Sequence, residues 1–133
     1  MSNAEQDARA KQFSAASDQC GIYVYGHFGW LFTVSLDGKD MGGVFSKRYF
    51  QNWEIDPGIH EIVISPQPGV NAWGWGKNPS LSISCAEGEI LFIEFKNLWS
   101  RSLEQERDDA EGREQIKDRR LILSGPMRKI PDS

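Results

Sequence analysis

The sequence predicts an all-β domain: an antiparallel β-sandwich of about seven short strands, with a short helix near the C-terminus. Apolar residues recur with a period of two from Cys20 onward, which is the pattern of half-buried strands. Thirteen Gly and six Pro in 133 residues mark frequent turns, so short elements are favoured over long helices. Hydrophobic residues make up 39% of the chain, which is enough for the packed core of a single domain.

The first predicted strands are separated by short turns. Residues 20–25 and 30–36 each alternate between two faces of a sheet. Asp37-Gly38 is expected to close a tight hairpin, because both residue types tolerate positive φ angles. The returning strand over 39–45 contains Gly42-Gly43, where we expect a bulge.

The later strands follow the same logic. Residues 48–55 form one strand, and Asp56-Pro57-Gly58 turns the chain into the next, over 59–65. Residues 80–85 alternate Ser with Leu, Ile and Cys, which is the clearest half-buried strand in the sequence. The apolar run 89–96 is expected to be a central strand that is covered on both faces.

Composition divides the chain into three parts. Residues 1–18 form a polar leader that we expect to be flexible, because Phe13 is its only large side chain. Residues 19–100 form the β-sandwich domain. Residues 101–133 contain no aromatic residue and balance eight basic against eight acidic side chains, so they should form a charged helix and tail that pack on the domain.

Within that tail, one helix and one further apolar element are expected. The helix should run from Asp109, as its cap, to about Arg119, and Gly112 should weaken it. Residues 121–123 should form either a last edge strand or an apolar anchor on the body of the domain.

Several short motifs occur in a defined order along residues 10–122: Ala10–Phe13, Ile22–Tyr25, Val34–Lys39, Tyr49-Phe50, Asp56–His60 and Glu87–Phe95. Together they resemble the DUF2846 family of bacterial envelope proteins. The resemblance implies a small sandwich similar to carbohydrate-binding-like and PEGA-type modules, in a secreted protein or lipoprotein of unknown function. Gly26 departs from the pattern, since the family usually has Arg there. The family has no established catalytic residues to carry over.

The expected location follows from this resemblance and from the start of the chain. Met1 is followed by Ser-Asn-Ala, a remnant often left by a cleaved tag, so a native signal sequence would have been replaced. We then expect a periplasmic protein, or a lipoprotein attached to the membrane only through a lipid outside this sequence. If Met1 is the native start, a cytoplasmic location is the alternative.

Charge and hydropathy exclude two other classes of partner. The net charge of −4 and the pI of about 5.2 lack the basic footprint of a nucleic-acid-binding domain. No apolar stretch approaches the roughly 20 residues of a membrane span. The expected partner is therefore an envelope protein or a glycan.

Cys20 and Cys85 are the only cysteines, and both lie on the inward face of a predicted strand. Two arrangements stay open. An oxidising compartment permits a disulfide between them if their Cα atoms lie within about 7 Å. Otherwise they are two separate buried thiols, since free Cys is among the most buried residue types.

Catalysis and metal binding have little support in the sequence. A nucleophilic triad of Cys85, His60 and Asp56 can be drawn, but Cys85 is expected to be interior and a reactive thiol needs access. His27 and His60 are the only imidazoles, and no pair of ligands has zinc-site spacing. No phosphate-binding loop occurs. We expect no enzyme activity, no metal and no cofactor.

The long loop over 66–79 is the most unusual segment. Trp73 and Trp75 are separated by one Gly, and exposed Trp faces can stack on sugar rings or on a protein partner. The loop also offers polar donors: Asn71, Lys77 and Asn78. The alternative is that the Trp rings fold back and cap the sandwich.

The sequence therefore favours a non-catalytic envelope module that binds or scaffolds a partner. A glycan-binding domain that uses the Trp73/Trp75 loop is the second hypothesis. An enzyme built on Cys85 and His60 is the third and weakest.

Overall fold

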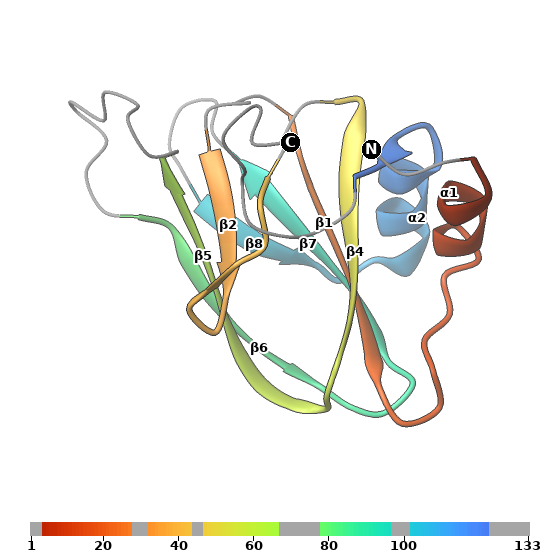
Figure 1. Cartoon of the computed structure of the whole chain (residues 1–133), viewed down its shortest axis with the longest axis horizontal. Coiled ribbons are helices and arrows are strands. Elements are labelled where there is room, and N and C mark those ends of the chain that lie inside the picture. The colour runs from red at the N-terminus through yellow and green to blue at the C-terminus, as the bar shows by residue number, and fades with distance from the viewer. Residues whose placement is uncertain (1–3, 28–31, 44–46, 67–77, 97–101, 123–133) are drawn as a thin grey trace, which may run out of the picture.

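The computed structural model describes residues 4–27, 32–43, 47–66, 78–96 and 102–122. These residues form two β-sheets that pack face to face, with two short helices beside one of them (Figure 1). This arrangement confirms the predicted all-β sandwich with a helix near the C-terminus.

The larger sheet has five strands in the order β8-β7-β1-β4-β9. β1 (Cys20–Gly26) pairs antiparallel with β4 (Tyr49–Ile55) and parallel with β7 (Ile90–Lys96). β8 (Ser102–Glu106) pairs antiparallel with β7, and β9 (Arg120–Leu121) runs parallel to β4. This sheet is mixed, whereas the sequence analysis predicted antiparallel strands only. Parallel partners are not joined by a hairpin, and a period-two pattern does not show the direction of a strand, so the sequence did not reveal this pairing.

The smaller sheet has four antiparallel strands in the order β3-β2-β5-β6. Its strands are β2 (Phe32–Leu36), β3 (Lys39–Asp40), β5 (Gly58–Pro66) and β6 (Ser80–Cys85). The two helices, α1 (Ala4–Ala10) and α2 (Asp109–Lys117), lie on the side of the five-stranded sheet (Figure 1).

The hairpin between β2 and β3 forms as the sequence predicts. Asp37 and Gly38 both have positive φ angles, 51° and 83°, as the turn requires. Beyond β3, Met41 donates to the carbonyl of Val34, and Val34 donates to the carbonyl of Gly42. Two residues thus oppose one at Val34, which is the irregularity of a bulge.

Two apolar clusters hold the layers together. Between the sheets lie mainly aliphatic side chains, together with one Trp and one Phe; among them are Ile22, Val34, Trp53, Ile62, Ile64, Ile93 and Phe95. Between the five-stranded sheet and the helices lie mainly aromatic side chains, among them Tyr23, Phe50, Phe92, Ile116 and Leu121. All seven residues of β1 are buried because this strand contributes to both clusters.

The boundary placed at residue 100 needs correction, because the five-stranded sheet continues beyond it. β8 and β9 are its two edge strands, and both come from the segment assigned to the tail. β9 contains Leu121 and agrees with the edge-strand alternative for residues 121–123. The sequence did not predict β8, because Leu103 is the only buried apolar residue of this strand and its other positions are polar. An edge strand with one anchored side chain gives too little alternation to be recognised.

The leader also differs from the expectation of a flexible segment, because α1 forms there and contacts β9. Asp7 accepts a hydrogen bond from the backbone N–H of Leu121 at 3.1 Å. The hydroxyl of Tyr23 donates to the carbonyl of Ala10, which is buried. These contacts join residues more than ten positions apart, so no local pattern reveals them.

Helix α2 forms where the sequence predicts it, but the cap is Asp108 and not Asp109, which is the first residue of the helix. The Asp108 carboxylate accepts hydrogen bonds from the backbone N–H groups of Ala110 and Glu111, at 3.0 and 3.3 Å. The carboxylate therefore satisfies two of the donors that a helix start leaves without a helical partner.

Gly112 was expected only to weaken α2, but it has a packing role. A Cβ atom built on Gly112 would lie 2.4–2.8 Å from three atoms of the Phe92 ring. The helix can therefore approach the sheet this closely only because position 112 carries no side chain.

We expect Gly112→Ala to lower the free energy of unfolding by about 1–3 kcal/mol, because the added methyl group overpacks the site against Phe92. The sign of the change in unfolding free energy is the test, since at a helix position without such a neighbour Gly→Ala stabilises the helix by about 1 kcal/mol. Urea denaturation measures the difference. Glu114→Ala, at an exposed position of the same helix, is the control and should stay within about 0.5 kcal/mol of the natural chain. A stabilised Gly112→Ala protein would contradict this account.

Candidate functional site

Most of the residues predicted to bind a ligand through the Trp loop lie outside the part of the chain that the structure describes. Asn71, Trp73, Trp75 and Lys77 lie outside the described residues. Asn78 is described and exposed, two residues before β6. The proposal that this loop binds a glycan therefore stays a prediction.

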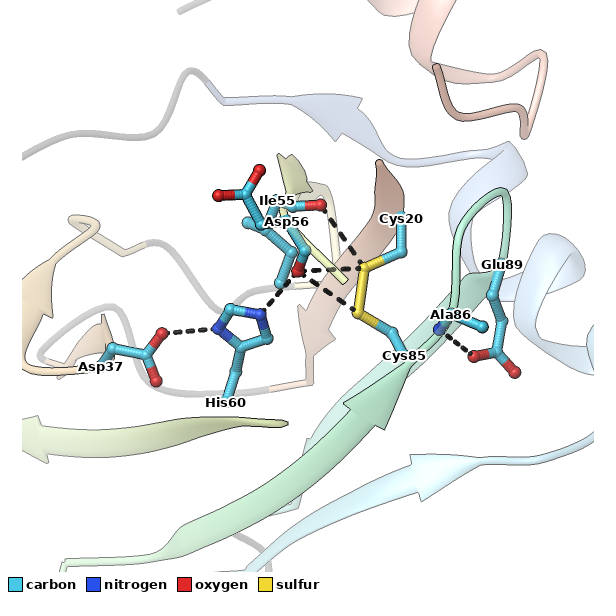
Figure 2. Close-up of a disulfide and its surroundings, with 8 residues drawn as sticks. All are labelled: Cys20, Asp37, Ile55, Asp56, His60, Cys85, Ala86 and Glu89. Atoms are coloured by element: carbon cyan, nitrogen blue, oxygen red, sulfur yellow. Dashed lines mark hydrogen bonds and ion pairs between the residues drawn. A yellow bond between two sulfur atoms is a disulfide. The ribbon is translucent and has the colours of Figure 1, made fainter. Parts of the chain in front are cut away.

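A disulfide joins Cys20 and Cys85, so the structure contains the first of the two arrangements that the sequence left open (Figure 2). The sulfur atoms are 2.00 Å apart and the Cα atoms are 6.2 Å apart. Cys20 opens β1 in the larger sheet and Cys85 ends β6 in the smaller one, so the bond links the two layers. The two residues are 0% and 4% exposed.

Backbone carbonyls of the β4–β5 turn lie against this disulfide. The Ile55 carbonyl oxygen is 3.5 Å from Cys20 Sγ, and the Asp56 carbonyl oxygen is 3.8 Å from Cys20 Sγ and 4.0 Å from Cys85 Sγ. The bonded sulfurs carry no proton to donate. The Asp56 carbonyl therefore needs another donor.

His60 supplies that donor (Figure 2). Its Nε2 lies 2.7 Å from the Asp56 carbonyl oxygen, and its Nδ1 lies 2.5 Å from Asp37 Oδ2. A carboxylate and a carbonyl are acceptors only, so His60 donates both hydrogen bonds at once only in its imidazolium form, in which each ring nitrogen carries a proton. The hydrogen bond that His60 donates to the Asp37 carboxylate raises the pKa of His60, and the same bond lowers the pKa of the Asp37 carboxyl.

The three residues of the triad drawn from the sequence do meet here, but in other roles. Asp56 offers its backbone carbonyl to His60, and the carboxylate partner of His60 is Asp37. The sulfur of Cys85 is bonded to Cys20. Sequence reasoning missed Asp37 because it serves as a turn residue. What brings Asp37 beside His60 is the register of β2 and β5, in which Leu36 pairs with Ile62. The sequence alone does not reveal this register.

A half-open cleft of about 550 Å³ lies at the start of β7, where β8 ends. Its walls come from the β6–β7 turn, the end of β8, the first turns of α2, and Phe13. Leu91 belongs to the cluster between the sheets, whereas Ile90 packs with the cluster under the helices. Because both residues line the cleft, it wraps around the edge of β7.

Three carboxylates line this cleft, and two of them are bound by nearby backbone. Glu89 accepts a hydrogen bond from the backbone N–H of Ala86 at 2.9 Å. Glu106 accepts one from the backbone N–H of Asp108 at 3.0 Å. Asp109 is the third.

Two arginines line the same cleft without a carboxylate partner. The guanidinium of Arg113 lies 5.4 Å from the centre of the Phe13 ring, within the range of a cation–π contact. Arg107 is exposed just beyond β8. Within the described ranges, neither guanidinium lies within 4.0 Å of a carboxylate oxygen. The N–H groups of both arginines are thus available to a ligand.

A second cluster of titratable groups lies at the other end of β1. Arg119 is buried, donates to the Gly26 carbonyl at 2.7 Å, and lies 5.0 Å from the centre of the Tyr25 ring. His27 Nε2 is 2.5 Å from Glu94 Oε2. Burial raises the pKa of Tyr25 and lowers that of Arg119. The Tyr25 hydroxyl and Arg119 Nε have no protein partner among the described residues, which is the situation that an internal water satisfies.

No protein-family model matches this chain, and no curated protein matches it. The resemblance to DUF2846 therefore stays a prediction. In the part of the chain that the structure describes, no helix is long and apolar enough to cross a membrane. Those same residues contain no group of three or more His, Cys, Asp or Glu side chains arranged to hold a metal ion.

Reduction of the Cys20–Cys85 bond should lower the free energy of unfolding by about 4 kcal/mol in the chain-entropy description, because the cysteines are 65 residues apart. Urea denaturation with and without a phosphine reductant measures this. The Cys20→Ala/Cys85→Ala double variant is the control, and the reductant should leave its midpoint unchanged. Titration of two free thiols in the unfolded, unreduced protein would rule out the bond.

The pair of His60 and Asp37 should make stability depend on pH. The raised pKa of His60 means that its contribution is complete below about pH 6 and declines as pH rises through that pKa. The lowered pKa of Asp37 means that its contribution is complete above about pH 4.5 and is lost as pH falls through that pKa. The stability lost on Asp37→Asn should therefore be largest between about pH 4.5 and 6.

Urea denaturation of the natural chain and of Asp37→Asn across pH 3–9 measures this difference. Asn is chosen as the replacement because it tolerates the positive φ angle at position 37, so the turn keeps its geometry while the carboxylate is lost. Glu87→Gln, at an exposed turn carboxylate, should show no such maximum. A pH-independent loss on Asp37→Asn would show that the ion pair makes no contribution.

Proposed function

We propose that this protein is a non-catalytic binding module of the cell envelope and that the cleft beside β7 receives its ligand. The buried Cys20–Cys85 disulfide is the observation that carries the location. Disulfides form and persist in oxidising compartments and are rare in the cytosol. The resemblance to the DUF2846 family supports the same location.

The cleft supports the binding role. Its volume of about 550 Å³ lies within the usual range of ligand sites. It combines apolar side chains, such as Phe13 and Ile90, with two guanidinium groups that the described chain leaves unpaired. The lining is mainly polar and charged, with a smaller apolar part, so the cleft suits a ligand that carries polar or charged groups.

The Cys/His enzyme hypothesis gains no support from the site. An attacking thiolate must be free and accessible. Cys85 is bonded to Cys20 and almost fully buried, and both nitrogens of His60 are engaged by Asp37 and Asp56.

The location is tested in cells that produce the natural protein. Free thiols are alkylated during denaturing lysis, and the disulfide is then reduced and labelled with a second reagent. We expect Cys20 and Cys85 to take only the second label, and the protein to fractionate with the envelope. A Cys20→Ser variant is the control, because its single Cys85 should take the first label. First-label modification of both cysteines in the natural protein would overturn the envelope location.

The binding role is tested by NMR titration of the labelled protein with short peptides and with an N-acetylglucosamine disaccharide. The proposal requires that a ligand shift the amide signals of residues that line the cleft, such as Ile90 and Arg113. Binding of the disaccharide elsewhere, lost on Trp73→Ala or Trp75→Ala, would favour the glycan-binding alternative instead.

A further inference from the structure

The edge of β7 is open where it enters the cleft. β8 ends at Glu106, opposite Phe92, so Ile90 has no strand neighbour on that side among the described residues. The Glu89 carbonyl accepts from Gly21 of β1. Successive backbone groups of a strand point to opposite edges, so the N–H and C=O of Ile90 point away from β1, towards the open side.

An open strand edge is a template for another extended chain. The cleft lies along this edge, because Ile90, Leu91 and Glu106 all line it. A peptide in extended conformation can pair with the N–H and C=O of Ile90 through two backbone hydrogen bonds, as in recognition by strand addition.

The two arginines indicate which part of a peptide this is. The cation–π contact with Phe13 holds the Arg113 guanidinium in the cleft and uses none of its N–H groups as hydrogen-bond donors to a carboxylate. A planar guanidinium binds a carboxylate through two parallel hydrogen bonds. Arg107 lines the same cleft and adds a second positive charge. The free carboxylate at the end of a peptide is an anion that such a guanidinium group can bind.

The three carboxylates of the cleft decide between a carboxylate and a phosphate as the anion. Glu89, Glu106 and Asp109 outnumber the two arginines, so the lining is negative overall. Such a lining repels a doubly charged phosphate more strongly than a singly charged carboxylate, so the carboxylate is the anion that the two guanidinium groups can bind at the lower electrostatic cost. A peptide also carries backbone N–H donors for the acidic side chains, and an apolar side chain can pack on Phe13 and Ile90.

We propose that the cleft binds the C-terminal end of a short peptide, with its carboxylate on Arg107 and Arg113 and its extended backbone beside Ile90. This inference rests on the proposed binding function and names the class of ligand for that site. The backbone N–H groups at the start of α2 are not part of the proposed site, because the Asp108 carboxylate already accepts hydrogen bonds from two of them.

The test uses two probes that differ in one group: N-acetyl-Val-Leu-Val with a free carboxylate, and the same tripeptide with a C-terminal amide. NMR titration or calorimetry measures the dissociation constants. We expect the carboxylate form to bind at least about tenfold more tightly, since a charge-assisted hydrogen bond is lost in the amide. Inorganic phosphate at equal concentration should not displace the peptide.

Variants of the two arginines complete the test. Arg107→Gln and Arg113→Gln should each weaken binding of the carboxylate probe by about tenfold or more, and should leave the weak binding of the amide unchanged. Both positions are exposed, so the melting temperatures should stay close to that of the natural chain. Arg9→Gln, on the exposed part of α1, is the matched control and should bind like the natural chain.

Equal affinity for the two probes, insensitivity to both arginine variants, displacement by phosphate, or no binding at millimolar peptide would each overturn this inference. None of these results changes the oxidation state of the cysteines in cells, which tests the envelope location. Conversely, reduced cysteines in cells would overturn that location without altering the peptide titration.

Discussion

Strand β1 is buried along its whole length, and the layers that cover its two faces, the smaller sheet and the pair of helices, follow from this constraint. One of its faces packs against the four-stranded sheet, and the other packs under the helices. A strand buried on both faces needs cover on both sides. The inner cover is the second sheet, and the outer cover is formed by α1 and α2, which lie near opposite ends of the chain (Figure 1). Segments outside the central sandwich are therefore part of the folded unit.

The disulfide connects this constraint to the cleft. Cys20 begins β1 and Cys85 ends β6, so the bond holds the two sheets together at the end where the β6–β7 turn leaves the smaller sheet. That turn forms one wall of the cleft, and Glu89 stabilises it by accepting from the N–H of Ala86. The covalent link on which the proposed location rests therefore also holds the segment that forms one wall of the proposed binding site.

The other walls depend on the close packing of α2. Gly112 lets the helix rest against Phe92, and the next residue is Arg113, whose guanidinium then lies over Phe13. Phe13 in turn packs with the aromatic rings of Tyr23 and Phe92. Residues from the leader, the sheet and the tail thus orient one positively charged group at the edge of β7.

The sequence by itself determined the fold class, most of the strands and the chemistry of the turns. Alternation of apolar residues reports which side of a strand is buried, and Asp37-Gly38 reports a local backbone requirement. Each of these patterns involves residues that are only a few positions apart in the chain, so the sequence alone shows it. They also placed Cys20 and Cys85 on inward faces, without deciding whether the two would meet.

The tertiary structure alone decided everything that depends on strand order and on contacts between distant segments. The parallel pairing of β1 with β7, the position of β8 at the edge, and the meeting of His60 with Asp37 are examples. The cleft is another, because Phe13, Glu89 and Arg113 come from three separate segments. A periodic pattern records the burial of each residue but not its neighbour, and a binding site is defined by its neighbours.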